Sequence, residues 1–267
     1  MSGWFRPALG VIEARGSDRV AWLSGLVTSD LATLSPTSAS YGLVLSKVGR
    51  ILSDACVLVD GARLLVGDSA PAAQILEHFE RHLVMEDVEL RDASADGDVW
   101  FVLGAAAGGA SIDLGLPSTS ALWVPAAERA RRAEELGEEL SPAAWDELRL
   151  AHGVPAFGVD FDAKTYPQEA RLEGRAVSFS KGCYLGQEVV CRLQMRGQVH
   201  RLLAPFEMSA PPPSPGEVAR IGGAEVGVVT SAAVVDGGVR GLAMLKRAAA
   251  APSTALELAG RSARVVG

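Results

Sequence analysis

The sequence predicts an α+β fold that ends in a compact antiparallel β-barrel. Near the N-terminus, β-rich runs are joined by an Asp-Gly turn, and amphipathic helical segments follow them. After Arg201, short strands alternate with glycine turns at the close spacing that is typical of a small barrel. The chain has 267 residues, of which 48% are hydrophobic, so it can bury a large core arranged in two or three lobes.

The N-terminal part is predicted to contain one short helix and three strands. Ser17 is expected to cap a helix over residues 17–26. The runs expected to form strands are 41–45, 51–59 and 63–66. Because Asp60-Gly61 separates the last two runs, we expect these strands to form a hairpin.

The middle of the chain is predicted to mix helices, strands and one long loop. An apolar stripe that includes Ile75 and Phe79 predicts an amphipathic helix over residues 69–85. The segments that follow are expected to be strands at 88–90 and 98–103, a Gly/Ala/Ser-rich loop at 105–120 and a charged helix at 126–139.

Ser141 and Pro142 open the best-marked helix of the sequence. Serine is a preferred N-cap and proline is tolerated at the first helical position. Gly153 is expected to end the helix. The residues predicted to face inward are Trp145, Leu148 and Ala151.

The C-terminal segment is predicted to form the barrel. A proline-rich turn at 211–216 is too short for an interdomain tether and suits a loop within a small domain. Strands are expected at 217–221, 225–230 and 239–245.

Asp54 is the first candidate site residue. It lies in a strand-like run and shares one face with Cys56 and Leu58. A carboxylate on an apolar strand must be paired, neutralised or directed into a solvent-filled pocket, because burying it alone is costly. A purely structural role for Asp54 stays open.

A second candidate site is Lys181-Gly-Cys-Tyr-Leu-Gly-Gln-Glu-Val-Val-Cys-Arg192. The two glycines predict a turn, and a helix is expected to begin near Gly186. Cys183 thus precedes a helix N-terminus and follows Lys181, two features that favour a thiolate. The alternative is a tight strand-to-helix connection with a buried cysteine.

Composition excludes several classes of protein. The formal net charge of −7 argues against a general binder of DNA or of membrane surfaces. No apolar run reaches membrane-spanning length, and we expect no secretory signal. Three widely spaced cysteines indicate reduced thiols in the cytosol rather than a disulfide framework, and they lack metal-binding spacing. A local basic cluster at Lys181, Arg192, Arg196 and Arg201 could receive an acidic partner or a polyglutamate tail.

The 181–192 segment resembles the signature of the YgfZ family of folate-binding proteins, with eight of twelve positions matched. This family is related to the glycine-cleavage T-protein, an aminomethyltransferase, and to a mitochondrial iron–sulfur assembly factor. T-proteins typically have an acidic residue and an aromatic at the positions of Cys183 and Tyr184, so the cysteine favours YgfZ.

Other segments are similar to the same families in the same order. They are Gly-Leu-Val-Thr-Ser-Asp at 25–30, Gly-Arg-Ile-Leu-Ser-Asp at 49–54, the pattern matched at Arg149, Gly153, Pro155, Gly158 and Asp160, Pro-Gln-Glu-Ala-Arg-Leu at 167–172 and two barrel segments at 226–232 and 241–247. Ser53 stands where T-proteins have one of two aspartates, and Phe157 where they often have tyrosine. These departures put inherited aminomethyl-transfer chemistry in doubt.

The resemblance implies a T-protein-like fold with two intertwined α/β lobes before the barrel. The expected boundaries are 1–200 for the folate-binding region, with sub-lobes near 1–95 and 96–200, and 201–267 for the barrel. It implies a cytoplasmic protein, which we expect to be a monomer, that binds tetrahydrofolate or a one-carbon derivative. Its expected partners are iron–sulfur enzymes or assembly proteins, including tRNA-modifying radical enzymes, without direct DNA binding or membrane contact.

The resemblance also implies roles for individual residues. Cys183, Lys181 and Asp54 are the candidates for chemistry. Glu169 is a candidate for binding the pterin ring, because a carboxylate can accept from two adjacent N–H groups. The other candidates for folate binding are Asp54 itself, Arg149, Tyr184, Gln187, Glu188 and Arg192. For Glu169, a loop cap is the structural alternative.

Three functions remain in competition on the sequence alone. The first is a folate-dependent accessory protein of iron–sulfur metabolism. The second is an aminomethyltransferase of glycine cleavage, or a related one-carbon transferase. The third is a scaffold that has kept the fold and lost the chemistry. The sequence leaves open whether the chain is an enzyme and whether Cys183 acts as nucleophile, redox group or transient metal ligand.

Overall fold

The computed structural model describes residues 2–104, 109–197, 199–209 and 211–267. Contacts divide the chain into two units. The first unit comprises Met1–Ser141 and Gly174–Glu188, and the second comprises Pro142–Glu173 and Val189–Gly267. Each unit therefore contains two segments that are distant in the sequence.

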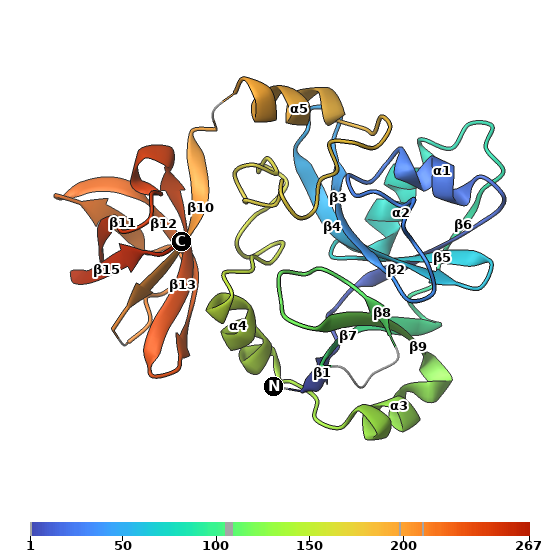
Figure 1. The fold of residues 1–267 in the computed structure, drawn as a ribbon, viewed down its shortest axis with the longest axis horizontal. Coiled ribbons are helices and arrows are strands. Elements are labelled where there is room, and N and C mark those ends of the chain that lie inside the picture. The colour runs from blue at the N-terminus through green and yellow to red at the C-terminus, as the bar shows by residue number, and fades with distance from the viewer. Residues whose placement is uncertain (1, 105–108, 198, 210) are drawn as a thin grey trace. The chain divides into compact units, whose positions relative to one another are not determined.

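A five-stranded antiparallel sheet forms the larger part of the first unit (Figure 1). Its strands, in spatial order, are β3 (Ser40–Leu45), β4 (Ile51–Asp60), β5 (Arg63–Asp68), β2 (Gly10–Arg15) and β6 (Glu89–Asp92). The hairpin predicted at Asp60-Gly61 is confirmed, with Asp60 opposite Arg63 and Gly61 at φ +57°. Glycine suits that turn because other residues rarely adopt a positive φ.

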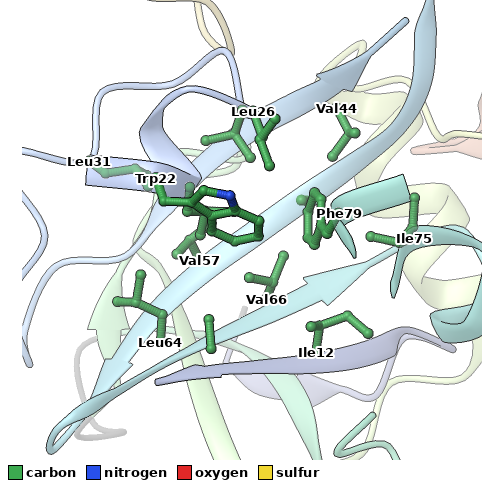
Figure 2. Packing of buried hydrophobic residues seen from close by; sticks show 14 of the residues in the cluster. Ile12, Trp22, Leu26, Leu31, Val44, Val57, Leu64, Val66, Ile75 and Phe79 are labelled. Carbon is green, nitrogen blue, oxygen red and sulfur yellow. The ribbon is translucent and has the colours of Figure 1, made fainter. Parts of the chain in front are cut away.

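Two helices, α1 (Arg19–Ser24) and α2 (Ala72–Glu80), contribute to the hydrophobic core on this sheet. Figure 2 shows Trp22 of α1 beside Phe79 of α2, and their ring centroids are 5.8 Å apart in an edge-to-face arrangement. Alternate strand residues such as Val57 and Val66 complete the core, as expected when one sheet face is covered.

Both helices are shorter than the sequence predicts. The expected cap, Ser17, instead donates its hydroxyl to Asp87 at 2.8 Å. Asp18 occupies the N-cap position without capping the helix, because its carboxylate accepts from the Asp87 N–H at 2.9 Å. Helix α2 ends at Glu80 rather than near residue 85, because the backbone N–H groups of Val84 and Met85 turn towards the Glu86 carboxylate. Side-chain acceptors in the loop thus replace the last helical turns.

A second, four-stranded sheet completes the first unit. Its order is β1 (Gly3–Phe5), β7 (Gly97–Leu103), β9 (Thr119–Pro125) and β8 (Ala110–Ser111), and η1 (Ala126–Glu128) with α3 (Arg129–Leu136) follow β9. The loop predicted for 105–120 is confirmed at residues 112–118 and wrong at β8 and the start of β9; residues 105–108 are outside the described residues. Pairing of β8 with β9, and of β9 with β7, overrides the weak strand propensity of this Gly/Ala/Ser-rich run.

The second unit contains a closed antiparallel barrel with the strand order β10-β13-β12-β11-β14-β15 (Figure 1). The strands are β10 (Arg201–Met208), β11 (Val218–Ile221), β12 (Ala224–Val235), β13 (Gly238–Lys246), β14 (Ala255–Leu258) and β15 (Arg261–Val265), with η2 (Arg247–Ala249) after β13. Position 241 in the barrel requires glycine, because a Cβ atom there would lie 2.4 Å from the Phe206 ring. The predicted small barrel is confirmed.

Two helices belong wholly or partly to the second unit. Helix α4 (Pro142–Ala151) begins where Ser141 and Pro142 predict, while α5 (Gln187–Met195) starts one residue after Gly186. The inward stripe predicted for α4 is wrong, because its buried residues are Arg149 and Leu150. In the described part of the chain, none of the helices has the length and apolar character needed to cross a membrane.

Candidate functional site

The cysteine-bearing loop that precedes α5 is anchored to the segment after α1. The Lys181 Nζ atom donates to the backbone carbonyl oxygens of Ser24 at 2.6 Å, Val27 at 2.7 Å and Ser29 at 2.8 Å. The Leu185 N–H donates to the Gly25 carbonyl at 2.9 Å. The loop is therefore held on both sides of Cys183.

Besides the contacts of Lys181 and Leu185, the loop has a third close contact, which requires glycine at position 186. Gly186 has φ +82°, and a Cβ atom there would lie 2.6 Å from the Ser46 carbonyl oxygen in the turn between β3 and β4. The loop therefore packs against that turn without room for a side chain. The motif glycine is explained by this close approach.

The three cysteines differ in exposure. Cys183 is exposed, Cys191 on α5 is half-buried, and Cys56 on β4 is buried. Burial raises the pKa of the Cys56 thiol, and the charge of Asp54 adds to that effect. Cys183 is thus the thiol presented to solvent, as the reactive-thiol hypothesis requires.

Asp54 is paired with a tyrosine. The Tyr41 hydroxyl donates to Asp54 Oδ2 at 2.7 Å. Burial raises the pKa of Asp54 even though the hydroxyls of Ser69 and Tyr41 favour its ionised form. No described donor meets hydrogen-bond geometry at Oδ1, which is shielded from solvent. Burial, together with the charge of Asp54, also raises the pKa of Tyr41, so Tyr41 remains the donor.

A second carboxyl lies on the neighbouring strand and the opposite face of the sheet. Asp68 is fully buried, and its Oδ2 atom accepts from the Ser53 hydroxyl at 2.9 Å, while Oδ1 accepts from the Ala70 N–H at 2.8 Å. Burial raises the pKa of Asp68 to about 8, with the two hydrogen bonds acting against this and the Asp54 charge reinforcing it. Ser53, which stands at the position of a T-protein aspartate, therefore donates its hydroxyl to Asp68 within the first unit.

A cavity of about 230 Å³ lies beside Tyr41 in the first unit. Arg175 lines it and also donates to the Leu114 carbonyl oxygen. The other lining residues are Ser29, Asp30, Ala39, Ser40, Asp113, Ala176, Val177 and Ser178. The cavity is smaller than the 300–1,000 Å³ typical of whole-ligand pockets, so its size suits one ring of a larger molecule.

Arg149 forms a buried polar network in the second unit. Its Nη1 atom lies 2.7 Å from Asp160 Oδ2, and Asp160 Oδ1 accepts from the hydroxyls of Thr230 at 2.5 Å and Ser231 at 2.6 Å. The network ties α4 to β12 of the barrel. The motif residues Arg149 and Asp160 therefore have a structural role in this unit.

Glu169 also makes contacts within the second unit. Its Oε1 atom accepts from Arg201 Nε at 2.9 Å, and Oε2 accepts from the Tyr166 N–H at 3.0 Å and from Arg201 Nη2 at 3.3 Å. The loop cap considered as the structural alternative is thus present. Binding of a pterin by Glu169 stays a prediction.

The remaining candidates lie near the start of α5. Tyr184 is 6% exposed, Gln187 is half-buried and Glu188 is exposed in the first unit, while Arg192 is exposed in the second unit. The Lys181 ammonium lies 5.1 Å from the centroid of the Tyr184 ring. Tyr184 therefore contributes to the packing of the loop as well as to the motif.

Sequence reasoning did not identify Tyr41 and Arg175 as site residues. Tyr41 was expected only as part of a strand, although its alternation with Leu43, the cross-strand partner of Asp54, places it on the same face of the sheet as Asp54. Arg175 carries no local signal, because its position beside the cavity depends on the 111–116 segment. In the described residues, no group of three or more His, Cys, Asp and Glu side chains is arranged to hold a metal ion.

Comparison with known proteins relates the chain to iron–sulfur assembly factors. Residues 201–266 match the family profile described as the CAF17 C-terminal beta-barrel domain. The iron–sulfur cluster assembly factor IBA57 homolog of Mycosarcoma maydis is 27% identical over 234 residues, which cover 78% of this chain and 58% of that protein. The human mitochondrial IBA57 is 29% identical over 239 residues, covering 77% and 66%.

The same fold occurs in a glycine-cleavage protein. The crystal structure of glycine cleavage system aminomethyltransferase T from Bartonella henselae matches with a TM-score of 0.84 at 22% identity, covering 100% of this chain and 85% of that one. The predicted T-protein-like α+β fold with a C-terminal barrel is confirmed. The chain spans a little over half the length of the fungal relatives, 57 to 58% for two of them.

Proposed function

We propose that this chain binds tetrahydrofolate, or a one-carbon derivative of it, and supports the assembly or repair of iron–sulfur proteins through the Cys183 thiol. The observation that carries the proposal is the exposed cysteine on an anchored loop. Relatives named as iron–sulfur cluster assembly factors, which align with about three quarters of the chain, support the biological role. The YgfZ-like motif around Cys183 supports the same assignment.

The proposed chemistry belongs to an accessible thiolate. Such a group can attack an electrophilic one-carbon unit, exchange disulfides or bind iron for a short time. The clients would be iron–sulfur enzymes or their assembly proteins, including tRNA-modifying radical enzymes. A cluster in transit would be the cargo of this chain rather than its resident cofactor.

Asp54 is the residue of the first unit that best fits a folate. Its shielded Oδ1 atom has no described donor, and a buried acceptor in that state calls for a water or a ligand N–H. Tyr41 holds the other oxygen and lines the cavity, whereas Asp54 is not among the lining residues, so the proposal requires a pterin N–H to reach Asp54 past Tyr41. The fold shared with an aminomethyltransferase is consistent with a folate ligand.

An aminomethyltransferase is the second candidate, because the fold match covers the whole chain. Two features disfavour it. Ser53 replaces an aspartate of the T-protein pattern and is bonded to Asp68, and Cys183 replaces an acidic residue. Turnover of an aminomethylated lipoyl carrier to methylene-tetrahydrofolate and ammonia, followed by mass spectrometry, would favour this candidate.

The other expectations about partners remain part of the proposal. We infer a cytosolic monomer without direct DNA or membrane binding, on the basis of the net charge of −7 and the three unpaired cysteines. The names of the two relatives described above include the word mitochondrial, and that location is a property of those two proteins. Cell fractionation and light scattering after gel filtration would test the location and the oligomeric state.

Genetic complementation tests the proposal. Deleting the gene in its host should lower the activity of radical or dehydratase iron–sulfur enzymes under oxidative stress. Wild-type protein should restore that activity and Cys183→Ser should not, whereas Cys191→Ser, the matched control on a half-buried cysteine, should restore it. Full rescue by Cys183→Ser would contradict the proposed role of the thiol.

A further inference from the structure

Three backbone carbonyl oxygens converge on the ammonium group of Lys181. The distances from Nζ are 2.6 Å to Ser24, 2.7 Å to Val27 and 2.8 Å to Ser29. A lysine ammonium has three N–H donors and no acceptor. The carbonyl oxygens therefore match the full donor capacity of the group.

One of the three acceptors lies where a helix leaves its carbonyls without partners, and the other two lie in the segment that follows the helix. Ser24 is the last residue of α1, Val27 forms an isolated β-bridge with Val44, and Ser29 lies in the bend that follows. The last carbonyls of a helix have no intrahelical donor, and a cation there is favoured by the helix dipole. Lys181, which is distant in the sequence, supplies a donor to the last helical carbonyl and also donates to the two carbonyls beyond the helix.

Lys181 is half-buried and still charged at neutral pH. Burial lowers the pKa of Lys181 to about 8, while the charge of Asp30 acts in the opposite direction. The charged form therefore predominates at pH 7, and the carbonyl contacts stabilise it further.

Two contacts hold the loop on either side of Cys183: the hydrogen bonds of Lys181 with the three carbonyls and the hydrogen bond of Leu185 with Gly25. Lys181 is bonded to the segment after α1, and Leu185 donates its N–H to Gly25 of the same segment at 2.9 Å. Between them, Gly182 and Cys183 are exposed, whereas Tyr184 is buried with its ring 5.1 Å from Nζ. The loop thus arches outward at the cysteine.

We propose that Lys181 is a positioning residue, which fixes the loop so that Cys183 is presented to solvent, and that it does not activate the thiol directly. With three carbonyls as acceptors, the ammonium has no N–H left to donate to a thiolate. The sequence had suggested that Lys181 contributes positive charge to Cys183, and the geometry points to a different task. This inference rests on the proposed function only in taking Cys183 as the working thiol.

The experiment compares Lys181→Met, Lys181→Gln and Lys181→Arg with wild type and with Lys47→Met. Lys47 is an exposed lysine in the turn after β3. Lys47→Met therefore makes the same chemical change without removing the hydrogen bonds between Lys181 and the three carbonyls. Two measurements are made on each full-length protein. One is hydrogen–deuterium exchange of the peptide that contains residues 178–186, and the other is the pH profile of Cys183 alkylation by iodoacetamide.

We expect loop exchange to rise about tenfold or more in Lys181→Met, because the carbonyl contacts are lost. Lys181→Gln and Lys181→Arg, which retain N–H donors, should recover part of the protection. The pH midpoint of Cys183 alkylation should stay the same in every variant that folds, and Lys47→Met should match wild type in both measurements.

The proposal is overturned if loop exchange is unchanged in Lys181→Met. It is also overturned if the alkylation midpoint rises in Lys181→Met and Lys181→Gln and returns in Lys181→Arg, since that pattern identifies an activating charge. Should Lys181→Met not fold, Lys181→Gln decides by the same two readouts. Neither measurement involves folate or a client protein. If Cys183→Ser retained full function in the complementation test, the proposed function would be contradicted and this result would be unaffected.

Discussion

The Tyr41 hydroxyl donates to Asp54 Oδ2 at 2.7 Å, from β3 to the neighbouring strand β4. The two residues are diagonal neighbours, because Leu43 lies directly opposite Asp54 in the antiparallel register. This contact fixes one carboxyl oxygen, while the other, Oδ1, is shielded and meets no described donor in hydrogen-bond geometry. It links the cavity beside Tyr41 to the carboxyl that is the candidate folate ligand.

Tyr41→Phe should destabilise the protein by about 1–2 kcal/mol, because Asp54 Oδ2 loses the donor of its part-buried hydrogen bond. The pKa of Asp54, already raised by burial, should rise further. Urea unfolding of Tyr41→Phe, Asp54→Asn and the double variant would give the coupling energy. Additive effects of the two substitutions would contradict a direct interaction.

Cys183 should react with iodoacetamide faster than Cys191 and much faster than Cys56 near neutral pH. The reason is exposure, since Cys183 is exposed, Cys191 is half-buried and Cys56 is buried with a raised thiol pKa. Peptide mapping of the time course by mass spectrometry measures the three rates in one sample. Slowest reaction at Cys183 would end the reactive-thiol account.

Asp68 should make the protein less stable as the pH rises. Burial raises its pKa in the folded state to about 8, above the ordinary value of 3.8, so between about pH 4 and 8 the folded state holds a proton that the unfolded state releases. The free energy of unfolding should therefore fall across this window, by up to about 1.4 kcal/mol per pH unit from this group.

Asp68→Asn is the matched test of that pH dependence. The amide keeps the shape of the protonated carboxyl and can remain bonded to Ser53, but it does not titrate. The difference in unfolding free energy between wild type and Asp68→Asn should grow with pH between about 4 and 8. Parallel curves over that range would show that Asp68 does not hold the proton.

Glu169→Ala should weaken tetrahydrofolate binding if Glu169 accepts from the pterin ring. The carboxylate also pairs with Arg201, so the binding loss needs a structural control. Arg201→Met removes the same ion pair while leaving the carboxylate in place. We expect calorimetry to show reduced affinity for Glu169→Ala and near wild-type affinity for Arg201→Met; equal losses would mean that Glu169 acts only through its structural link.

Local patterns in the sequence predicted many of the elements. Ser141-Pro142 marked the start of α4, Asp60-Gly61 marked the hairpin, and glycine turns between short runs marked the barrel strands. Each signal is short-range, because a cap or a turn is specified by adjacent residues. Strand β8 was missed, since its residues acquire their conformation only by pairing with β9.

The site depended more on contacts between distant residues. Lys181 reaches carbonyls at Ser24 to Ser29, and no residue-type pattern identifies a backbone acceptor. Arg149 was expected on a ligand but is bonded to Asp160, a partner that motif spacing alone did not indicate. Cys183, by contrast, was predicted from its local surroundings, and its exposure is consistent with that prediction.

Anaerobic titration calorimetry with tetrahydrofolate tests the central claim most directly. We predict saturable binding by the wild-type protein, with a loss of about tenfold or more in affinity for Asp54→Ala, which lacks the carboxyl proposed to accept from a ligand N–H. Cys191→Ser should bind as wild type does. An absence of binding heat with the folded wild-type protein at several temperatures would contradict the account.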